Sequence, residues 1–130
     1  VDIQPEMLAR IQKRAAKAGI TNLKLVLATE KSPALPANTI DLVLMVDAYH
    51  EFVCPREVMS AVYESLAPGG KVVLSEYRAE GPAIPSLRLH KMSEQQVRRE
   101  MAAVGLEFVE NGDLLPQQHF LIFSKADETL

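Results

Sequence analysis

The stretch IDLVLMVDAY at residues 40–49 constrains the fold of this chain most, because it is largely apolar and is bounded by polar residues. A strand with one face in water alternates apolar and polar side chains, whereas a strand covered on both faces is nearly continuously apolar. Covered strands of this kind occur in parallel sheets that carry helices on both faces. The stretch therefore predicts a buried strand within an α/β fold.

Three segments carry the signals of helices. Pro5 and Pro55 stand at the first turn of two of them, and Ser93 with Gln96 forms a capping-box pair at the start of the third. Apolar residues follow three or four positions apart, and each segment runs into a glycine. These signals predict helices over residues 5–19, 55–67 and 93–105.

Four further segments are typical of strands: residues 22–28, 71–77, 106–115 and 117–126. The last two follow each other without a helix between them, which predicts an antiparallel C-terminal hairpin at one edge of the sheet. The alternation of the other strands with helices predicts a mostly parallel sheet with helices on both faces. We therefore expect one Rossmann-like α/β domain over residues 1–130.

Composition excludes several classes of function. The formal net charge is −3, and the 14 Lys and Arg residues are scattered along the sequence, so no nucleic acid or anionic membrane is expected as a partner. No apolar stretch approaches the ~20 residues that span a bilayer. The single cysteine, Cys54, cannot form an internal disulfide and indicates a reducing compartment, so we expect a cytoplasmic protein.

Ligands of such sheets bind beyond the carboxyl ends of the strands. The residues that directly follow the predicted strands are therefore the candidates: Asp2 and Ile3, residues 28–30, residues 47–52 and residues 76–78. Among them, the group DAYHEF at residues 47–52 follows the central apolar strand. Its side chains are therefore candidates for contact with a ligand.

Three stretches occur in an order typical of one enzyme family: VDIQPEML, LPANTIDLVLMVDAYHEF and LAPGGKVVLSEY. The first is similar to an acid at the end of the family's second strand, the second to its Leu-Pro, Phe-Asp-x-Val and His segment, and the third to its Leu-x-Pro-Gly-Gly segment. Together the stretches resemble the class I S-adenosylmethionine-dependent methyltransferases of the type 11, or UbiE-like, group. The resemblance implies methyl transfer from S-adenosylmethionine to a small-molecule acceptor.

The resemblance also implies cofactor-binding roles. A carboxylate accepts hydrogen bonds from two ribose hydroxyls at once, which is the role implied for Asp2; its alternative role is to cap the following helix. Ile3 would pack on the adenine ring or belong to the core. Thr29 and Glu30 stand where the family holds the adenine amino group, but ATE replaces the usual Gly-Asp-Ala, and Glu30 would alternatively be a solvated charge. Asp47 is expected at the cofactor as well.

Tyr49, His50 and Glu51 are the expected catalytic residues, because they end the strand toward which a transferable methyl group would point. Methyl transfer mainly requires alignment of donor and acceptor and exclusion of water. A base is needed only where the acceptor must lose a proton, and His50 is the expected base because histidine titrates near neutrality. The alternative is a structural histidine hydrogen-bonded at the strand end.

Two further sets of side chains carry weaker signals. His50, His90 and His119 lie far apart in sequence and form no His-x-x-x-His pair, so no metal site is expected even with Glu51 and Glu76 as further possible ligands. The segment after the strand at 71–77 suits an anionic or polar acceptor, or equally a solvated loop, through its basic side chains: Arg78, Arg88, His90 and Lys91.

The start of the chain leads to a last expectation. In the family a strand, a Gly-x-Gly turn and a helix precede the acid by about 20 residues, whereas here the acid is residue 2. We therefore expect a carboxyl-side portion of a longer protein, inactive alone, whose open apolar sheet edges favour a homodimer or a swapped assembly. Two other functions fit the pattern: a non-catalytic methyltransferase-like association module, and a nicotinamide- or flavin-binding Rossmann domain.

Overall fold

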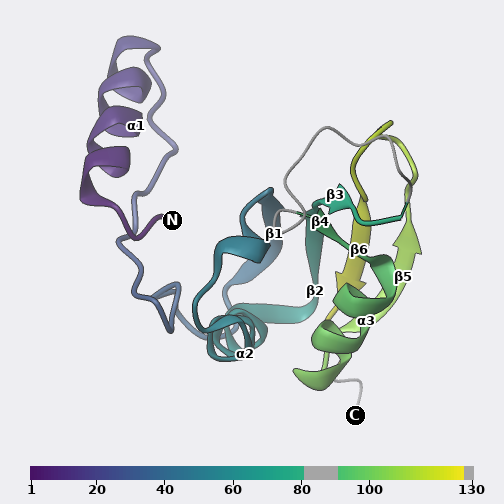
Figure 1. Ribbon diagram of the computed structural model, residues 1–130. Helices are drawn as coiled ribbons and strands as arrows, with labels where there is room; N and C mark the ends of the chain where they lie inside the picture. Colours follow the sequence, from purple (N-terminus) through teal and green to yellow (C-terminus); the bar gives the residue numbers. More distant parts are fainter. Residues whose placement is uncertain (81–90, 128–130) are drawn as a thin grey trace.

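The computed structural model describes residues 1–80 and 91–127, and Figure 1 shows an N-terminal lobe standing apart from a main body. The N-terminal lobe, residues 1–30, holds helix α1 (Pro5–Lys17). The main body, residues 38–80 and 91–127, holds the other elements in chain order: β1 (Ile40–Val46), the 3-10 turn η1 (Tyr49–Glu51), α2 (Pro55–Ser65), β2 (Leu66–Ser75), β3 (Tyr77–Arg78), β4 (Lys91–Met92), α3 (Glu94–Ala103), β5 (Glu107–Asn111) and β6 (Leu121–Ser124).

The N-terminal lobe is held together by one parallel bridge between Asp2 and Leu27. The Asp2 N–H donates to the Val26 carbonyl at 3.2 Å, and the Ala28 N–H donates to the Asp2 carbonyl at 2.9 Å. The continuous strand predicted over residues 22–28 is reduced to this bridge. A ladder needs a partner along its whole length, and α1 begins only three residues after Asp2.

The sheet of the main body has the strand order β1-β2-β6-β5. The pair β1 and β2 is parallel, with Val43 opposite Val72 and Met45 opposite Leu74, while β6 is antiparallel to both β2 and β5. The α/β class and the C-terminal antiparallel hairpin are confirmed. The sheet is mixed rather than mostly parallel. The second strand of the hairpin, β6, inserts beside β2 and runs antiparallel to it.

The hydrophobic core lies on one face of this sheet. Met59 of α2 and Met101 of α3 belong to the same buried cluster as Leu74 and Phe123 of the strands, so both helices cover the same face. The other face of β1 exposes Leu42, Leu44 and Val46 by 59%, 63% and 55%. The expected cover of helices on both faces is therefore not present among the described residues, since α1 lies in the N-terminal lobe (Figure 1).

Helix α2 and strand β2 follow each other along the chain with fewer residues between them than predicted. The helix ends at Ser65 and the strand begins at Leu66, and a side chain at Gly70 would come within 3.0 Å of the Ile40 carbonyl oxygen. Lys125, only 7% exposed, donates its Nζ to the carbonyls of Tyr63 and Leu66 at 3.2 and 2.9 Å. This cation satisfies carbonyl groups at the end of the helix, which explains how a lysine is tolerated there.

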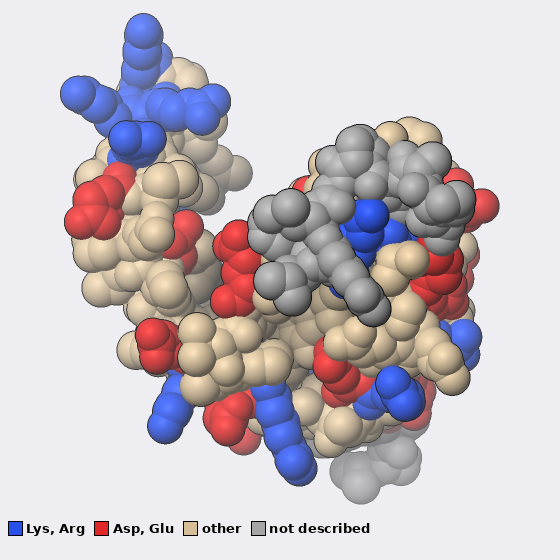
Figure 2. Space-filling model, viewed as in Figure 1, with Lys and Arg blue, Asp and Glu red and all other residues tan. Residues whose placement is uncertain are grey.

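Figure 2 shows Lys and Arg side chains gathered at the outer end of the N-terminal lobe. Residues 10, 13, 14 and 17 of α1 are basic and exposed, a spacing that puts them along one side of a helix. The positive charges are therefore less scattered than the sequence indicated, and the absence of a nucleic-acid partner stays a prediction. No helix in the described part of the chain has the length and apolar character to cross a bilayer.

The core predicts a clear stability difference between two apolar side chains. Phe123→Ala removes a side chain that is fully buried and is expected to lower the free energy of unfolding by about 3–5 kcal/mol. Leu114→Ala, at a position that is 73% exposed, is the control and is expected to change it by less than about 0.5 kcal/mol. Urea denaturation followed by circular dichroism measures both, and similar values for the two variants would contradict this core.

Candidate active site

The predicted cofactor-binding residues of the N-terminal lobe lie together. The parallel bridge between Asp2 and Leu27 brings the chain after Asp2 beside the chain after Ala28, so Ile3 and residues 29–30 follow two adjacent extended segments on the same side. Asp2 is half-buried, and its Oδ1 accepts a hydrogen bond from the Gln4 N–H at 2.8 Å. Ile3 is 55% exposed. This group offers a carboxylate beside an uncovered apolar side chain.

Thr29 and Glu30 differ in how far their side chains are engaged. The Thr29 hydroxyl accepts hydrogen bonds from the N–H groups of Lys31 and Ser32 at 3.3 and 3.1 Å, which is a local turn. Glu30 is exposed. The sequence did not distinguish Thr29 from Glu30 as the residue for the adenine amino group. The side chain of Glu30 is the better able of the two to hold an amino group.

Asp47 forms the corner at the end of β1. Its N–H donates to the Ser75 carbonyl at 2.8 Å, next to the last rung of the ladder with β2, and its φ of 50° lies in the left-handed region, which aspartate tolerates better than most residues. Both carboxylate oxygens accept from Nε2 of Gln118, at 2.8 and 2.6 Å. The carboxylate is thus held by the loop that precedes β6.

His50 is held by Glu76, the residue that follows β2. Oε1 of Glu76 accepts from the His50 backbone N–H at 3.1 Å, and Oε2 lies 2.6 Å from the ring Nδ1. The Glu76 side chain is fully buried and that of His50 is 8% exposed. Glu51 follows in the same turn with a side chain that is 71% exposed, and its Oε1 lies 3.9 Å from Nε2 of His50. Asp47, His50 and Glu51 therefore cluster at the carboxyl ends of β1 and β2.

Tyr49 is engaged with α3. It is 4% exposed, its hydroxyl donates to Oε2 of Glu100 at 2.8 Å, and its ring packs edge-on against Phe52 with centroids 5.6 Å apart. The pKa of Tyr49 is raised well above its usual value of 10.0. The largest cause is burial of the phenol, and the second is its hydrogen bond to the Glu100 carboxylate. Tyr49 stays a predicted catalytic residue, but these contacts favour a structural role.

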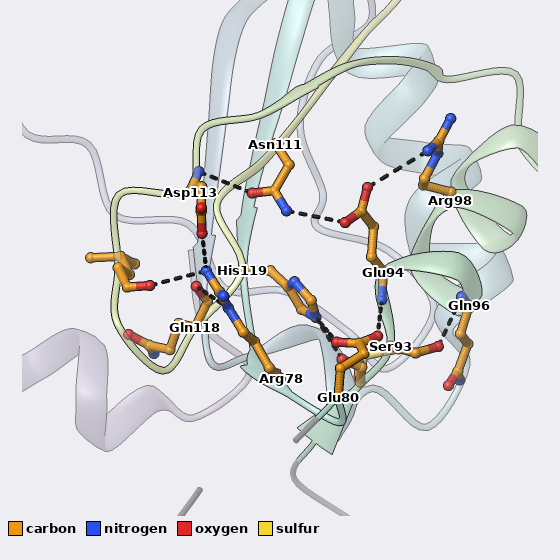
Figure 3. A network of polar contacts seen from close by, with 12 residues as sticks. Arg78, Glu80, Ser93, Glu94, Gln96, Arg98, Asn111, Asp113, Gln118 and His119 are labelled. Atoms are coloured by element: carbon orange, nitrogen blue, oxygen red, sulfur yellow. Dashed lines mark hydrogen bonds and ion pairs between the residues drawn. The ribbon is translucent and has the colours of Figure 1, made fainter. Parts of the chain in front are cut away.

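Figure 3 shows a second polar network that involves Arg78 and His119. Arg78 forms an ion pair with Asp113 and donates to the carbonyls of Leu115 and Gln118, so its guanidinium fastens the loop before β6 instead of standing ready for an anionic acceptor. Lys91 lies in β4. The other two residues proposed for the acceptor, Arg88 and His90, lie outside the described residues. Within the described ranges, no group of three or more His, Cys, Asp or Glu side chains could hold a metal ion.

A family model for the methyltransferase domain matches residues 1–74. The chain belongs to the methyltransferase domain family. The match includes Asp2, Thr29, Glu30 and the whole segment from Asp47 to Phe52. It confirms the resemblance to type 11 methyltransferases, and S-adenosylmethionine is the cofactor of this kind of domain. No curated protein matches the sequence.

Solved structures share the fold. A SAM-dependent methyltransferase from Aquifex aeolicus is 18% identical with a TM-score of 0.85, over 94% of this chain and 65% of that one. The [4+2]-cyclase SpnF is 14% identical with a TM-score of 0.80, over 96% and 64%. An O-methyltransferase family 2 protein from Planctomyces limnophilus DSM 3776 is 20% identical with a TM-score of 0.76, over 96% and 42%. This methyltransferase domain thus spans less than two thirds of each of these proteins.

Sequence reasoning gave no role to three residues that hold the site. The sequence indicates Glu76 only as a residue after a strand and as a possible metal ligand, whereas Gln118 and Glu100 carry no signal. Gln118 is 71 positions from Asp47, and Glu100 is 51 positions from Tyr49. A contact over such distances leaves no periodic pattern in one sequence, so only the tertiary structure reveals it.

The contacts of Tyr49 predict a stability effect at high pH. A phenol whose pKa is raised on folding stabilises the protein fully below pH 10, about the pKa of an unfolded tyrosine, and this contribution is lost as the pH rises further. We expect the free energy of unfolding to fall above pH 10 more steeply in the wild type than in Tyr49→Phe. Glu100→Gln, which removes the charged acceptor, should also make the slope shallower. Urea denaturation at several alkaline pH values measures the slopes; equal slopes in all three proteins would contradict the assignment.

Proposed function

We propose that the whole protein transfers a methyl group from S-adenosylmethionine to a small-molecule acceptor, and that residues 1–130 alone do not complete the reaction. The observation that carries the proposal is the family match over residues 1–74, which contains the predicted cofactor residues and the His50 turn. The described fold adds that His50 is held at a strand end by a buried carboxylate. A cytoplasmic location belongs to the same proposal and is supported by the single cysteine.

The N-terminal lobe carries side chains that suit this cofactor. Asp2 uses one carboxylate oxygen for the Gln4 N–H, and a carboxylate has lone pairs for further donors such as ribose hydroxyls. Ile3 offers an exposed apolar surface for the adenine ring, and Glu30 offers an acceptor for its amino group. When bound, the cofactor supplies a methyl carbon whose bond to the sulfonium breaks with the electron pair left on sulfur, as the acceptor atom forms the new bond with its own lone pair.

The main body would align the acceptor and manage its proton. Asp47, fixed by Gln118, stands at the corner between β1 and the His50 turn. His50 would act as the base for an acceptor that must lose a proton, because a neutral imidazole has a ring nitrogen that can accept one. Burial of the turn against α3 through Tyr49 restricts the motion of the backbone around it.

Binding of S-adenosylhomocysteine to this chain tests the cofactor assignment. Isothermal titration calorimetry is expected to show micromolar binding, and none with NAD at the same concentration. Asp2→Asn should weaken the binding at least about tenfold, since hydrogen bonds to charged groups contribute about 1.5–3 kcal/mol. Asp41→Asn changes an exposed carboxylate at the start of β1 and serves as the control. Equal affinities in the two variants, or preference for NAD, would contradict the proposal.

We also propose that a second copy of the chain covers the open face of β1. The support is the exposure of Leu42, Leu44 and Val46 on one strand together with exposed Leu23 and Leu27 in the N-terminal lobe. An exposed apolar patch on the face of a strand favours association with another chain, and β1 is also the terminal strand of the described sheet. The resulting assembly would be a homodimer or a swapped dimer.

Light scattering after size-exclusion chromatography tests this association. The wild type is expected at twice the chain mass of 14.4 kDa. Leu44→Lys should shift the protein to the monomer, because a charge on the interface would lose its hydration. Leu114→Lys, at a leucine of the hairpin loop that is also exposed, should leave the dimer intact. A folded wild-type monomer at micromolar concentration would sink the idea.

A further inference from the structure

The N-terminal lobe and the main body each leave apolar surface in water. Figure 1 shows that the lobe stands apart from the body, and in the lobe Ile3, Leu23 and Leu27 are each about half exposed. On the main body, the open face of β1 is exposed to a similar extent. Burial of apolar surface is the main favourable term in association, so each of these two surfaces is suited to cover the other.

The segment that joins the two parts, residues 31–37, holds the lobe away from its own main body. Pro33 and Pro36 lie in it, and the ring of a proline fixes φ. Directly after it, the N–H groups of Asn38 and Thr39 donate to the carbonyls of the last two residues of α2, at 3.0 and 2.9 Å. Folding the lobe back onto its own β1 would have to reverse the chain within this short segment, which the prolines and these anchors oppose. The lobe is therefore an arm that is better placed to reach another chain.

The two parts also carry opposite charge. The lobe, residues 1–30, has five basic and three acidic residues and thus a formal charge of +2, and its stretch over residues 7–29 holds no Asp or Glu. The main body, residues 38–80 and 91–127, has thirteen acidic and seven basic residues, a formal charge of −6. Figure 2 shows the basic side chains gathered at the outer end of the lobe. Electrostatic attraction therefore favours contact between the lobe of one chain and the body of another, whereas two main bodies repel each other.

We propose that the N-terminal lobe of one copy covers the open face of β1 in a second copy, so that two chains exchange their lobes reciprocally. Exchange of an identical element between two copies forms a dimer without any new kind of interface. This inference rests on the proposed function and deepens it, because two chains then supply the cofactor groups. Asp2 and Glu30 come from the lobe of one chain and Asp47 from the main body of the other, so the site is complete only in the dimer.

NMR of a mixed dimer locates the lobe without any ligand. One chain is labelled with ¹⁵N, and the other carries a nitroxide at Asp41→Cys, an exposed position at the start of β1. Both contain Cys54→Ser, which removes the only cysteine and places a favoured residue at the N-cap of α2. After the two chains are refolded together, paramagnetic broadening is expected at amides of residues 1–30 of the ¹⁵N-labelled chain. A nitroxide at Glu110→Cys, exposed in β5 at the opposite edge of the sheet, is the matched control and should leave these amides sharp.

The ¹⁵N-labelled chain carries no nitroxide, so broadening reports only contact between chains. Broadening confined to its main body would show that two main bodies associate and would overturn the exchange. Equal broadening of residues 1–30 from both nitroxide positions would also overturn it. A folded monomer would contradict the exchange together with the proposed association.

The composite site predicts complementation between two defective variants. Asp2→Asn impairs the lobe and Asp47→Asn impairs the main body. An exchanged mixed dimer has one site in which both parts are unchanged, so random mixing of equal amounts should restore about one quarter of the sites. Calorimetry with S-adenosylhomocysteine is expected to show this fraction at the wild-type affinity. No restored fraction from two variants that are each weakened would overturn the composite site. A wild type without binding would instead contradict the proposed function, and the NMR experiment would still decide the exchange.

Discussion

The parallel pairing of β1 with β2 is the interaction on which the candidate active site depends. The ladder runs to Val46 opposite Ser75, and the Asp47 N–H continues it to the Ser75 carbonyl. Because the strands are parallel, both chains leave the sheet at the same edge, and residues that are 26 positions apart meet there as His50 and Glu76. A slip of one residue would turn every side chain of the shifted strand to the opposite face of the sheet and would separate this pair.

The hydrophobic core and the polar site depend on the same packing. Leu74 and Phe123 are fully buried under α2 and α3, and Glu76 follows β2 without any exposed surface. Electrostatic interactions strengthen where water is excluded, so burial makes the bond between Glu76 and His50 strong and makes an unpaired Glu76 costly. Stability and the position of His50 are therefore linked through a single carboxylate.

The fold does not define the reaction by itself. The same architecture is similar to a SAM-dependent methyltransferase and to a [4+2]-cyclase, in keeping with the rule that function resides in sites placed on a fold. In this chain the candidate groups belong to two parts: Asp2, Ile3 and Glu30 to the N-terminal lobe, and Asp47 with His50 to the main body. The exposed apolar face of β1, where we propose that a second copy of the chain packs, belongs to the main body.

Local signals in the sequence determined the elements that are stabilised within themselves. Pro5 begins α1, the Ser93 side chain accepts from the Gln96 N–H at the start of α3, and the apolar run over residues 40–49 contains β1. Residues 22–28 had the composition of a strand but form only a bridge, because a strand exists through its partner and not through its own sequence. The insertion of β6 beside β2 likewise depends on which strands pair with each other, and no local signal in the sequence indicates that choice.

The sequence by itself also determined which residues follow the strands, and it thereby indicated Asp2, Asp47 and His50 as candidates for the site. Only the tertiary structure decided that Glu76 orients His50, that Gln118 holds Asp47, and that Tyr49 turns to Glu100. The physical reason is that these bonds join residues 26, 71 and 51 positions apart, respectively. Periodicity and capping act within a few residues, whereas these contacts exist only after the strands and helices have packed together.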